Sequence, residues 1–169
     1  MLIDMRRIYL ANSLGFSMLA RPAVAAIAAR LEREGFEVFE PFTASKNLGA
    51  EIARLQATEN DFNVLKKKLR AINEEIGKRN AEAIERSTCV IAILDGGFDV
   101  DSGVAAEIGY AAGKGKMIFG LRTDFRPGGD NIGSTINLQV EHFIAATGGS
   151  IAPDVEALIG LLKRARAAN

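Results

Sequence analysis

A group of acidic residues follows the most apolar segment of the sequence. Residues 89–94 (C-V-I-A-I-L) contain no charged side chain, and three aspartates come next: Asp95, Asp99 and Asp101. Glu107 stands further on, as the only acidic residue of a segment rich in alanine and glycine, 102–114. Carboxylates at a ligand site can act as nucleophiles or as general acids and bases. The spacing therefore indicates carboxylate chemistry, with Glu107 as the candidate nucleophile.

Two interpretations of Glu107 remain open at the level of spacing. It can be a carboxylate near a helix N-terminus that the helix dipole stabilises, with no further role. Alternatively, its small neighbours leave a cavity in which the carboxylate meets a substrate. In the second case we expect the helix N-terminus to help keep Glu107 ionised, which is the form that attacks.

The segments that must position these side chains alternate between strand-like and helical patterns. Apolar runs at 8–11, 37–39, 89–94 and 117–121 predict strands, and 21–34, 102–114 and the segment from Pro153 onward predict helices. We expect Ser102 to be the N-cap of the second helix and Gly115 to follow its end. This order predicts an α/β fold of three layers, flavodoxin-like or Rossmann-like. A central parallel sheet of about five strands would carry helices on both faces, within a single domain over 1–169.

A charged segment separates the second strand from the third. Residues 48–87 have helical spacing with a break near Asn60, but their apolar periodicity is weaker than that of a core helix. The basic run 66–70 is balanced by Glu74 and Glu75, which is typical of a solvated helix face. An interface and a lid are both open interpretations of the segment.

Ligands of open α/β sheets bind beyond the carboxyl ends of the strands. Three predicted loops lie there: 12–21, 95–103 and the polar, glycine-rich 122–137. Neither the Gly96-Gly97 pair nor the Gly128-Gly129 pair matches a dinucleotide or phosphate-loop signature. We expect no cofactor and no metal, and a structural or surface role for His142, the single histidine.

The composition argues against several classes of partner. Lys and Arg number 21, as do Asp and Glu, so the formal charge is +0 and a nucleic acid polymer is not expected to bind. No segment approaches the roughly 20 apolar residues of a membrane span, and none resembles a signal peptide. Cys89 is the single cysteine, which predicts a reducing, cytoplasmic location.

The run Asp101 to Ala111 (D-S-G-V-A-A-E-I-G-Y-A), preceded by V-I-A-I-L-D-G at 90–96, resembles the nucleoside 2-deoxyribosyltransferase family. The resemblance extends to Ile8–Ala11, to 115–126 and to Asn137-Leu138, and so covers most of the chain apart from 48–76. It implies a pentosyltransferase of nucleotide salvage that moves 2-deoxyribose from a deoxynucleoside to a free nucleobase. It also implies a homo-oligomer.

The resemblance assigns roles to individual residues. Glu107 falls on the nucleophile that forms a covalent deoxyribosyl ester, Asp101 on the acid beside the nucleobase, and Tyr9 on the tyrosine that orients the nucleophile. Asn137 falls on an asparagine that reaches the sugar of a neighbouring subunit's site. We expect the remaining substrate contacts from a further set of residues: Asn80, Asp95, Gly103, Leu14 and Phe16. Leu14 and Phe16 would wall the nucleobase, although plain packing explains them equally well.

Three departures from the family pattern leave the substrate open. Asn80 and Thr88 stand where aspartates are frequent, and Asn12-Ser13 replaces a common Gly-Pro. One alternative is a hydrolase of 2'-deoxynucleoside 5'-monophosphates, an N-glycosidase whose phosphate would meet Ser13, Ser17 and Arg21. Another is a nucleotide-binding module without turnover, because Asn80 cannot supply a charge.

Overall fold

A parallel five-stranded sheet forms the centre of the molecule in the computed structural model, which describes residues 6–97 and 99–168. Its strands are β1 (Arg7–Ala11), β2 (Glu37–Phe39), β3 (Cys89–Ile93), β4 (Met117–Leu121) and β5 (Ile151–Ala152), in the order β2-β1-β3-β4-β5. This order is that of flavodoxin-like folds, so the expected fold class is confirmed.

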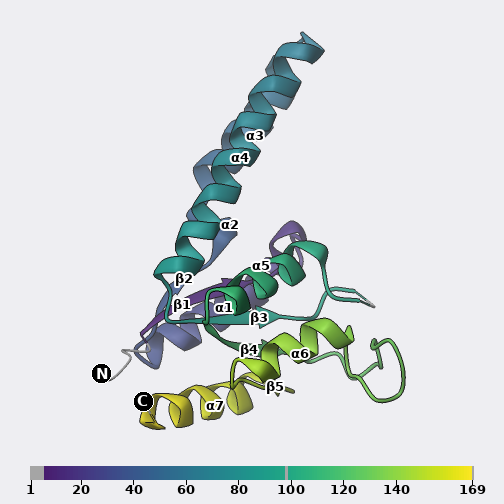
Figure 1. Ribbon diagram of the computed structural model, residues 1–169. Coiled ribbons are helices and arrows are strands. Elements are labelled where there is room, and N and C mark those ends of the chain that lie inside the picture. The colour runs from purple at the N-terminus through teal and green to yellow at the C-terminus, as the bar shows by residue number, and fades with distance from the viewer. Residues whose placement is uncertain (1–5, 98, 169) are drawn as a thin grey trace.

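The sheet is covered on both faces (Figure 1). Helices α1 (Arg21–Arg33) and α7 (Val155–Ala168) pack against one face through Leu31, Leu158 and Leu162. The other face lies under α5 (Ser102–Gly113), α6 (Leu138–Ala146) and the C-terminal end of α4 (Phe62–Arg86). Every residue of β3 is buried, as expected for a central strand between two helical layers.

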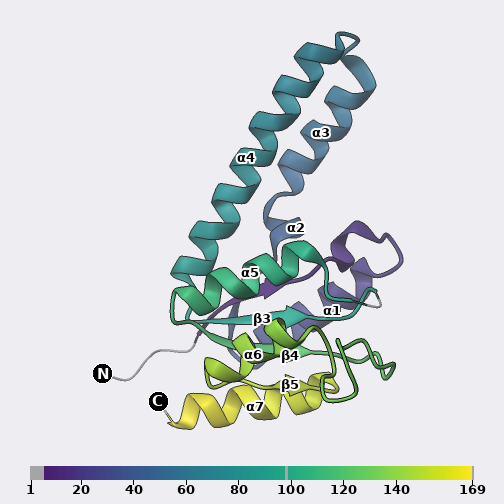
Figure 2. The ribbon, with the colours of Figure 1, turned by 45° about the vertical axis from the view of Figure 1, so that its right-hand side comes forward.

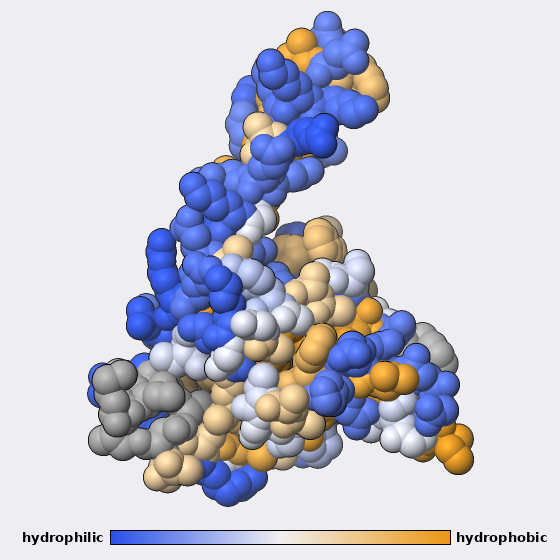
Figure 3. Space-filling model, viewed as in Figure 1, coloured by the Kyte–Doolittle hydropathy of each residue, from blue (hydrophilic) through white to orange (hydrophobic). Residues whose placement is uncertain are grey.

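Helices α3 (Lys46–Thr58) and α4 form a hairpin that projects from the α/β body (Figures 1 and 2). The predicted break is confirmed, because α3 ends at Thr58 and the Asp61 side chain caps α4. The face of the hairpin that Figure 3 shows is mostly hydrophilic. Among the described residues of the hairpin, the buried apolar ones are Leu55 in α3 and Ile84 at the base of α4. The hairpin therefore adds little to the core.

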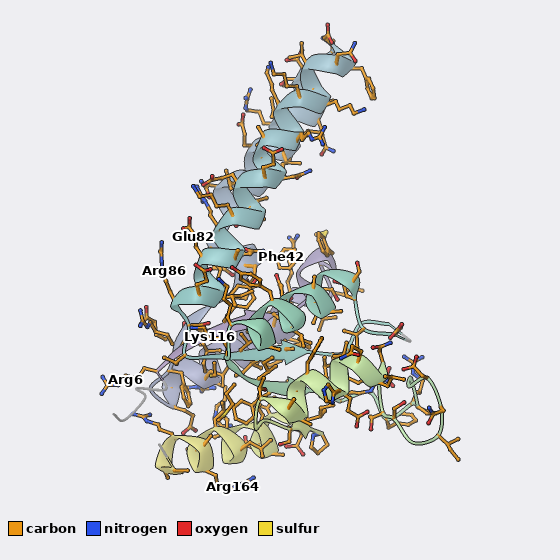
Figure 4. The ribbon with its side chains drawn as sticks, viewed as in Figure 1. Arg6, Phe42, Glu82, Arg86, Lys116 and Arg164 are labelled. Carbon is orange, nitrogen blue, oxygen red and sulfur yellow. The ribbon has the colours of Figure 1, made fainter. Side chains whose placement is uncertain are left out.

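The base of α4 is fixed to the body. Lys116, labelled in Figure 4, precedes β4 and donates hydrogen bonds to the backbone oxygens of Glu85 and Ser87 at 2.7 and 2.8 Å. A cation at this place also pairs with backbone carbonyl oxygens of the last helical turn, which have no partner within the helix. The C-terminal half of α4, which carries Asn80, is thus held in a defined position over the sheet.

The carboxyl ends of β1, β3 and β4 open into the three expected loops. The first contains a short 3-10 helix, η1 (Leu14–Phe16), and the short helix α2 (Pro41–Ala44) follows β2. The third loop, 122–137, ends at α6. Phe98 of the second loop lies outside the described residues. Within the described ranges, no helix combines the length and apolarity needed to cross a membrane.

Candidate functional site

Tyr9 and Glu107 meet between the sheet and α5. Tyr9 is fully buried on β1, on the face that α4 and α5 cover, and Glu107 is half-buried in the second turn of α5. The Tyr9 hydroxyl donates a hydrogen bond to Glu107 Oε1 at 2.5 Å. No ion pair involves Glu107 in the described part of the chain. A carboxylate held by a neutral donor rather than by a cation keeps its charge available for a ligand.

The surroundings of Glu107 oppose its ionisation. Burial raises the pKa of its carboxyl to about 7, the negative charge of Asp101 adds to this, and the hydrogen bond from Tyr9 acts in the opposite direction. The help expected from the helix N-terminus stays a prediction, and burial outweighs it in the net pKa. Glu107 lies beyond the first turn of α5, which holds no acidic side chain, so the dipole acts on it weakly and burial dominates.

Tyr9 remains a proton donor at any ordinary pH. Burial raises the pKa of its phenol far above the usual value, and the negative charges of Glu107 and Glu40 raise it further. The phenol consequently stays neutral and donates its hydrogen to Glu107.

Asn80 on α4 approaches the same carboxylate. Its Nδ2 lies 3.5 Å from Glu107 Oε1. Its Oδ1 is buried and accepts no hydrogen bond from the residues that the structure describes. Asn80, Tyr9 and Glu107, three of the predicted site residues, thus come together from three elements.

Asp101 begins α5. Its Oδ1 accepts hydrogen bonds from the backbone N–H groups of Gly103 and Val104 at 2.9 and 3.1 Å. Asp101, rather than the expected Ser102, is therefore the N-cap, because Ser102 already has helical geometry. A Cβ on Gly103 would lie 3.0 Å from Asp101 Oδ1, so glycine allows the tight cap. Asp101 is exposed, and its charge acts on Glu107.

Asp95 connects the ends of β3 and β4. It accepts hydrogen bonds from the backbone of Thr123 and Asp124 at 2.9 and 3.0 Å, and from the Thr123 hydroxyl at 2.6 Å. Its carboxylate is therefore committed to holding the start of the loop 122–137. That loop borders a cavity of about 570 Å³ whose lining includes Arg122, Ser134 and Pro153.

The first loop presents Phe16 and hides Leu14. Phe16 is 79% exposed and packs edge-on against Phe42 of α2, with ring centroids 4.8 Å apart. Phe42, labelled in Figure 4, comes from the segment that joins the hairpin to the sheet. Leu14 packs partly against the core on the α1 side. Phe16 remains available to a ligand, whereas Leu14 acts mainly in packing.

Sequence reasoning missed a buried polar pair beside this loop. Asn12 follows β1 and donates a hydrogen bond to Glu40, at the end of β2, at 3.0 Å. Asn12 Oδ1 accepts the N–H of Gly15, and Glu40 caps α2 through the N–H groups of Phe42 and Thr43. The pair therefore holds the backbone beside Phe16 and Phe42, whose two rings we call the aromatic rim. The Glu40-Pro41 dipeptide was an available signal, since proline favours the first helical position after a cap.

Asn137 caps α6, and its Oδ1 accepts the N–H groups of Gln139 and Val140 at 3.1 and 3.3 Å. Its Nδ2 makes no hydrogen bond to another described residue. His142, on α6, is exposed. Across residues 6–97 and 99–168, no three His, Cys, Asp or Glu side chains gather closely enough to hold a metal.

Comparisons with known proteins identify a family and a shared fold. The sequence matches the family model described as nucleoside 2-deoxyribosyltransferase over residues 8–141. No curated protein matches the chain. Among solved structures, a 2-deoxyribosyltransferase from Leishmania mexicana is 21% identical, with 94% of this chain and 97% of that chain covered and a TM-score of 0.62. The corresponding enzyme from Bacillus psychrosaccharolyticus is 20% identical, with 90% and 89% covered and a TM-score of 0.61.

A structure described as an N-glycosidase also shares the fold. The CMP N-glycosidase from Clostridium botulinum is 16% identical, with 94% of this chain and 97% of that chain covered and a TM-score of 0.54. At such identities, the structural similarities show a common fold and leave the reaction open.

Proposed function

The chain belongs to the nucleoside 2-deoxyribosyltransferase family, and we propose that it cleaves the N-glycosidic bond of 2'-deoxynucleosides and transfers the sugar to another nucleobase. The observation that carries this proposal is the half-buried Glu107 held by the neutral Tyr9 hydroxyl. The carboxyl is oriented without an ion pair, and its ionised form, which is populated as the pH rises through about 7, is the form that attacks.

In the first displacement, a lone pair of Glu107 forms a bond to C1' while the bond from C1' to the base nitrogen breaks. The bonding pair leaves with the base, which takes up a proton. The transition state resembles an oxocarbenium ion, which an adjacent carboxylate stabilises and then traps. Since a 2-deoxyribosyl sugar lacks the electron-withdrawing 2'-hydroxyl, its cation forms more readily.

Asp101 would exchange the proton with the base. Its Oδ1 is occupied by the helix cap, whereas Oδ2 accepts no hydrogen bond from a described residue, and the residue is exposed. In the second displacement, a nitrogen of the acceptor base attacks C1', the ester bond breaks, Glu107 regains its charge, and Asp101 accepts the proton released by the base. Two displacements at C1' give overall retention.

The rim would hold the base and the sugar. The exposed ring of Phe16, supported by Phe42, offers a surface against which a flat base can stack. We also propose a homo-oligomer in which the free Nδ2 of Asn137 reaches the sugar in a neighbouring site, as the family resemblance implies. Light scattering of the purified protein measures the mass of the oligomer. Asn137→Ala should lower activity and leave the mass of the oligomer unchanged.

The central test is base exchange. Purified protein is incubated with deoxyadenosine and a free pyrimidine or purine base, and the exchanged nucleoside is measured by chromatography. Glu107→Gln should lower turnover by at least about 1,000-fold while the circular dichroism spectrum is unchanged. A slow fluorinated deoxynucleoside should leave a sugar adduct on Glu107, detectable by mass spectrometry. Ligand binding without exchange, hydrolysis or adduct would instead identify a module without turnover.

A hydrolase of 2'-deoxynucleoside 5'-monophosphates is the second candidate, because the fold is shared with a CMP N-glycosidase. Arg21 is exposed and donates through Nε to the backbone oxygen of Gly15 at 2.7 Å, which places its guanidinium beside the first loop. A phosphate site there would make kcat/KM much higher for the monophosphate than for the nucleoside. Arg21→Ala would then abolish that preference, whereas a transferase of nucleosides would show none.

A further inference from the structure

The two hydrogen bonds that Glu107 accepts from described residues end on one oxygen. Oε1 receives the Tyr9 hydroxyl at 2.5 Å and the Asn80 Nδ2 at 3.5 Å. Oε2 receives none from the same residues. The two oxygens of the carboxylate are therefore not equivalent, although neither donor is charged.

The orientation of the Asn80 amide follows from the same contact. A carboxylate offers only acceptors, so the amide nitrogen must face it, because the carbonyl oxygen would be repelled. Asn80 Oδ1 then points elsewhere, and it is buried without a partner among the described residues. An unpaired buried acceptor costs free energy. The amide nevertheless keeps this orientation, because its nitrogen faces the Glu107 carboxylate.

We propose that Asn80 is a positioning residue for the nucleophile: with Tyr9 it holds Oε1 of Glu107, so that Oε2 is the oxygen that bonds to C1'. This proposal rests on the proposed function for its chemical step, in which the Oε2 lone pair forms the new bond and the C1'–N pair leaves with the base. The role differs from the substrate contact expected for Asn80, since here the side chain donates to the nucleophile. An aspartate at position 80 could not play it, because an ionised carboxylate has no hydrogen to donate.

Few groups face Glu107, so the effect of Asn80 can be isolated. Tyr9 faces it from β1, Asn80 from α4, and Asp101 acts on it from the cap of α5. The charge of Glu40 acts on the Tyr9 phenol and is not among the causes of the Glu107 shift. A carboxylate at position 80 would add a second like charge and remove a donor. Both changes disfavour the ionised Glu107 and raise its pKa.

The test uses the free protein, so it does not depend on turnover. Glutamate side chains are labelled with 13C at the carboxyl carbon, the Glu107 signal is assigned from its loss in Glu107→Gln, and its pKa is measured by NMR. Asn80→Asp should raise that pKa by about one unit or more. Asn73→Asp, an exposed position of the same helix, serves as the matched control and should leave it unchanged. Equal pKa values in Asn80→Asp and the unmodified protein would overturn the proposal.

Kinetics add a second, separate readout. Asn80→Ala should lower kcat about tenfold. Asn80→Asp should move the acid limb of the pH profile of kcat to higher pH. Circular dichroism checks that both variants keep the fold of the unmodified protein. A change confined to KM, with kcat and the acid limb unaltered, would show Asn80 to be a substrate contact only. An unmodified protein that turns over no deoxynucleoside would defeat the proposed function, and the NMR titration would still test whether the side chain at position 80 acts on the Glu107 carboxylate.

Discussion

The Tyr9 hydroxyl and Glu107 Oε1 lie 2.5 Å apart although 98 positions separate the two residues in the chain. The contact joins β1 to α5 across the buried face of the sheet. Because the phenol has lost its access to water and keeps its proton, it serves as a permanent donor to a carboxylate whose own ionisation is disfavoured. One pair of side chains thus links the orientation of the candidate nucleophile to its charge.

Replacing Tyr9 by phenylalanine should affect both properties. We expect kcat/KM at pH 7 to fall about 10- to 100-fold, the range for a lost hydrogen bond to a charged group. The acid limb of the pH profile should move upward, because the Tyr9 bond lowers the Glu107 pKa. Tyr110→Phe is the matched control, since Tyr110 donates its hydroxyl to Glu85 on α4. An unshifted acid limb in Tyr9→Phe would contradict this prediction.

Glu107 should also make the fold sensitive to pH. Its pKa is about 7 in the folded chain against 4.5 as the reference value. A carboxyl with a raised pKa contributes stability that is complete below pH 4.5 and is lost as the pH rises through about 7. Glu107→Gln cannot ionise and therefore avoids this loss. The melting temperature of Glu107→Gln minus that of the unmodified protein should be larger at pH 8 than at pH 5. The same difference at both pH values would argue against a buried, ionising Glu107.

Asp95 should control the loop 122–137. Asp95→Ala removes the acceptor of the N–H groups of Thr123 and Asp124, a local cost of about 0.5–1.5 kcal/mol per bond because water can reach these groups. We expect faster hydrogen exchange in the loop and a higher KM, with kcat less affected. Asp99→Ala is the control, because Asp99 accepts only a bond from the adjacent Val100 N–H among those described. Unchanged exchange in Asp95→Ala would show that the loop is held by other contacts.

Two glycines should respond to alanine in opposite ways. A Cβ on Gly149 would lie 1.6 Å from the backbone oxygen of Ile118, so Gly149→Ala should destabilise the protein by about 2 kcal/mol or more. Gly77 lies inside α4, where a Cβ would meet no neighbouring atom within 4 Å, and Gly77→Ala should stabilise by up to about 1 kcal/mol. Urea unfolding measures both changes. Equal stabilities of the two variants would refute the close packing of the β4–β5 edge.

Local patterns were enough to predict most of the fold. The continuous apolar run of β3, the proline and glycine at the ends of α1, and the break before α4 are each properties of neighbouring residues. Helix α6 and strand β5 were not predicted. β5 has two residues, too few for a period, and it forms because β4 offers it hydrogen bonds. The N-cap of α5 was placed one residue late, since aspartate and serine are equally good caps in sequence.

The sequence by itself determined which residue types were available: a lone Glu107 among small neighbours, Asp101 ahead of it, a tyrosine in the first strand. The tertiary structure alone decided that Tyr9 and Asn80 share one oxygen of Glu107, that Asp95 is bound to a loop, and that Asn12 and Glu40 support the aromatic rim. The physical reason is that strand and helix patterns arise from neighbours in the chain. Contacts across tens of residues depend on sheet register and helix packing, and the same burial sets the pKa of the carboxylate.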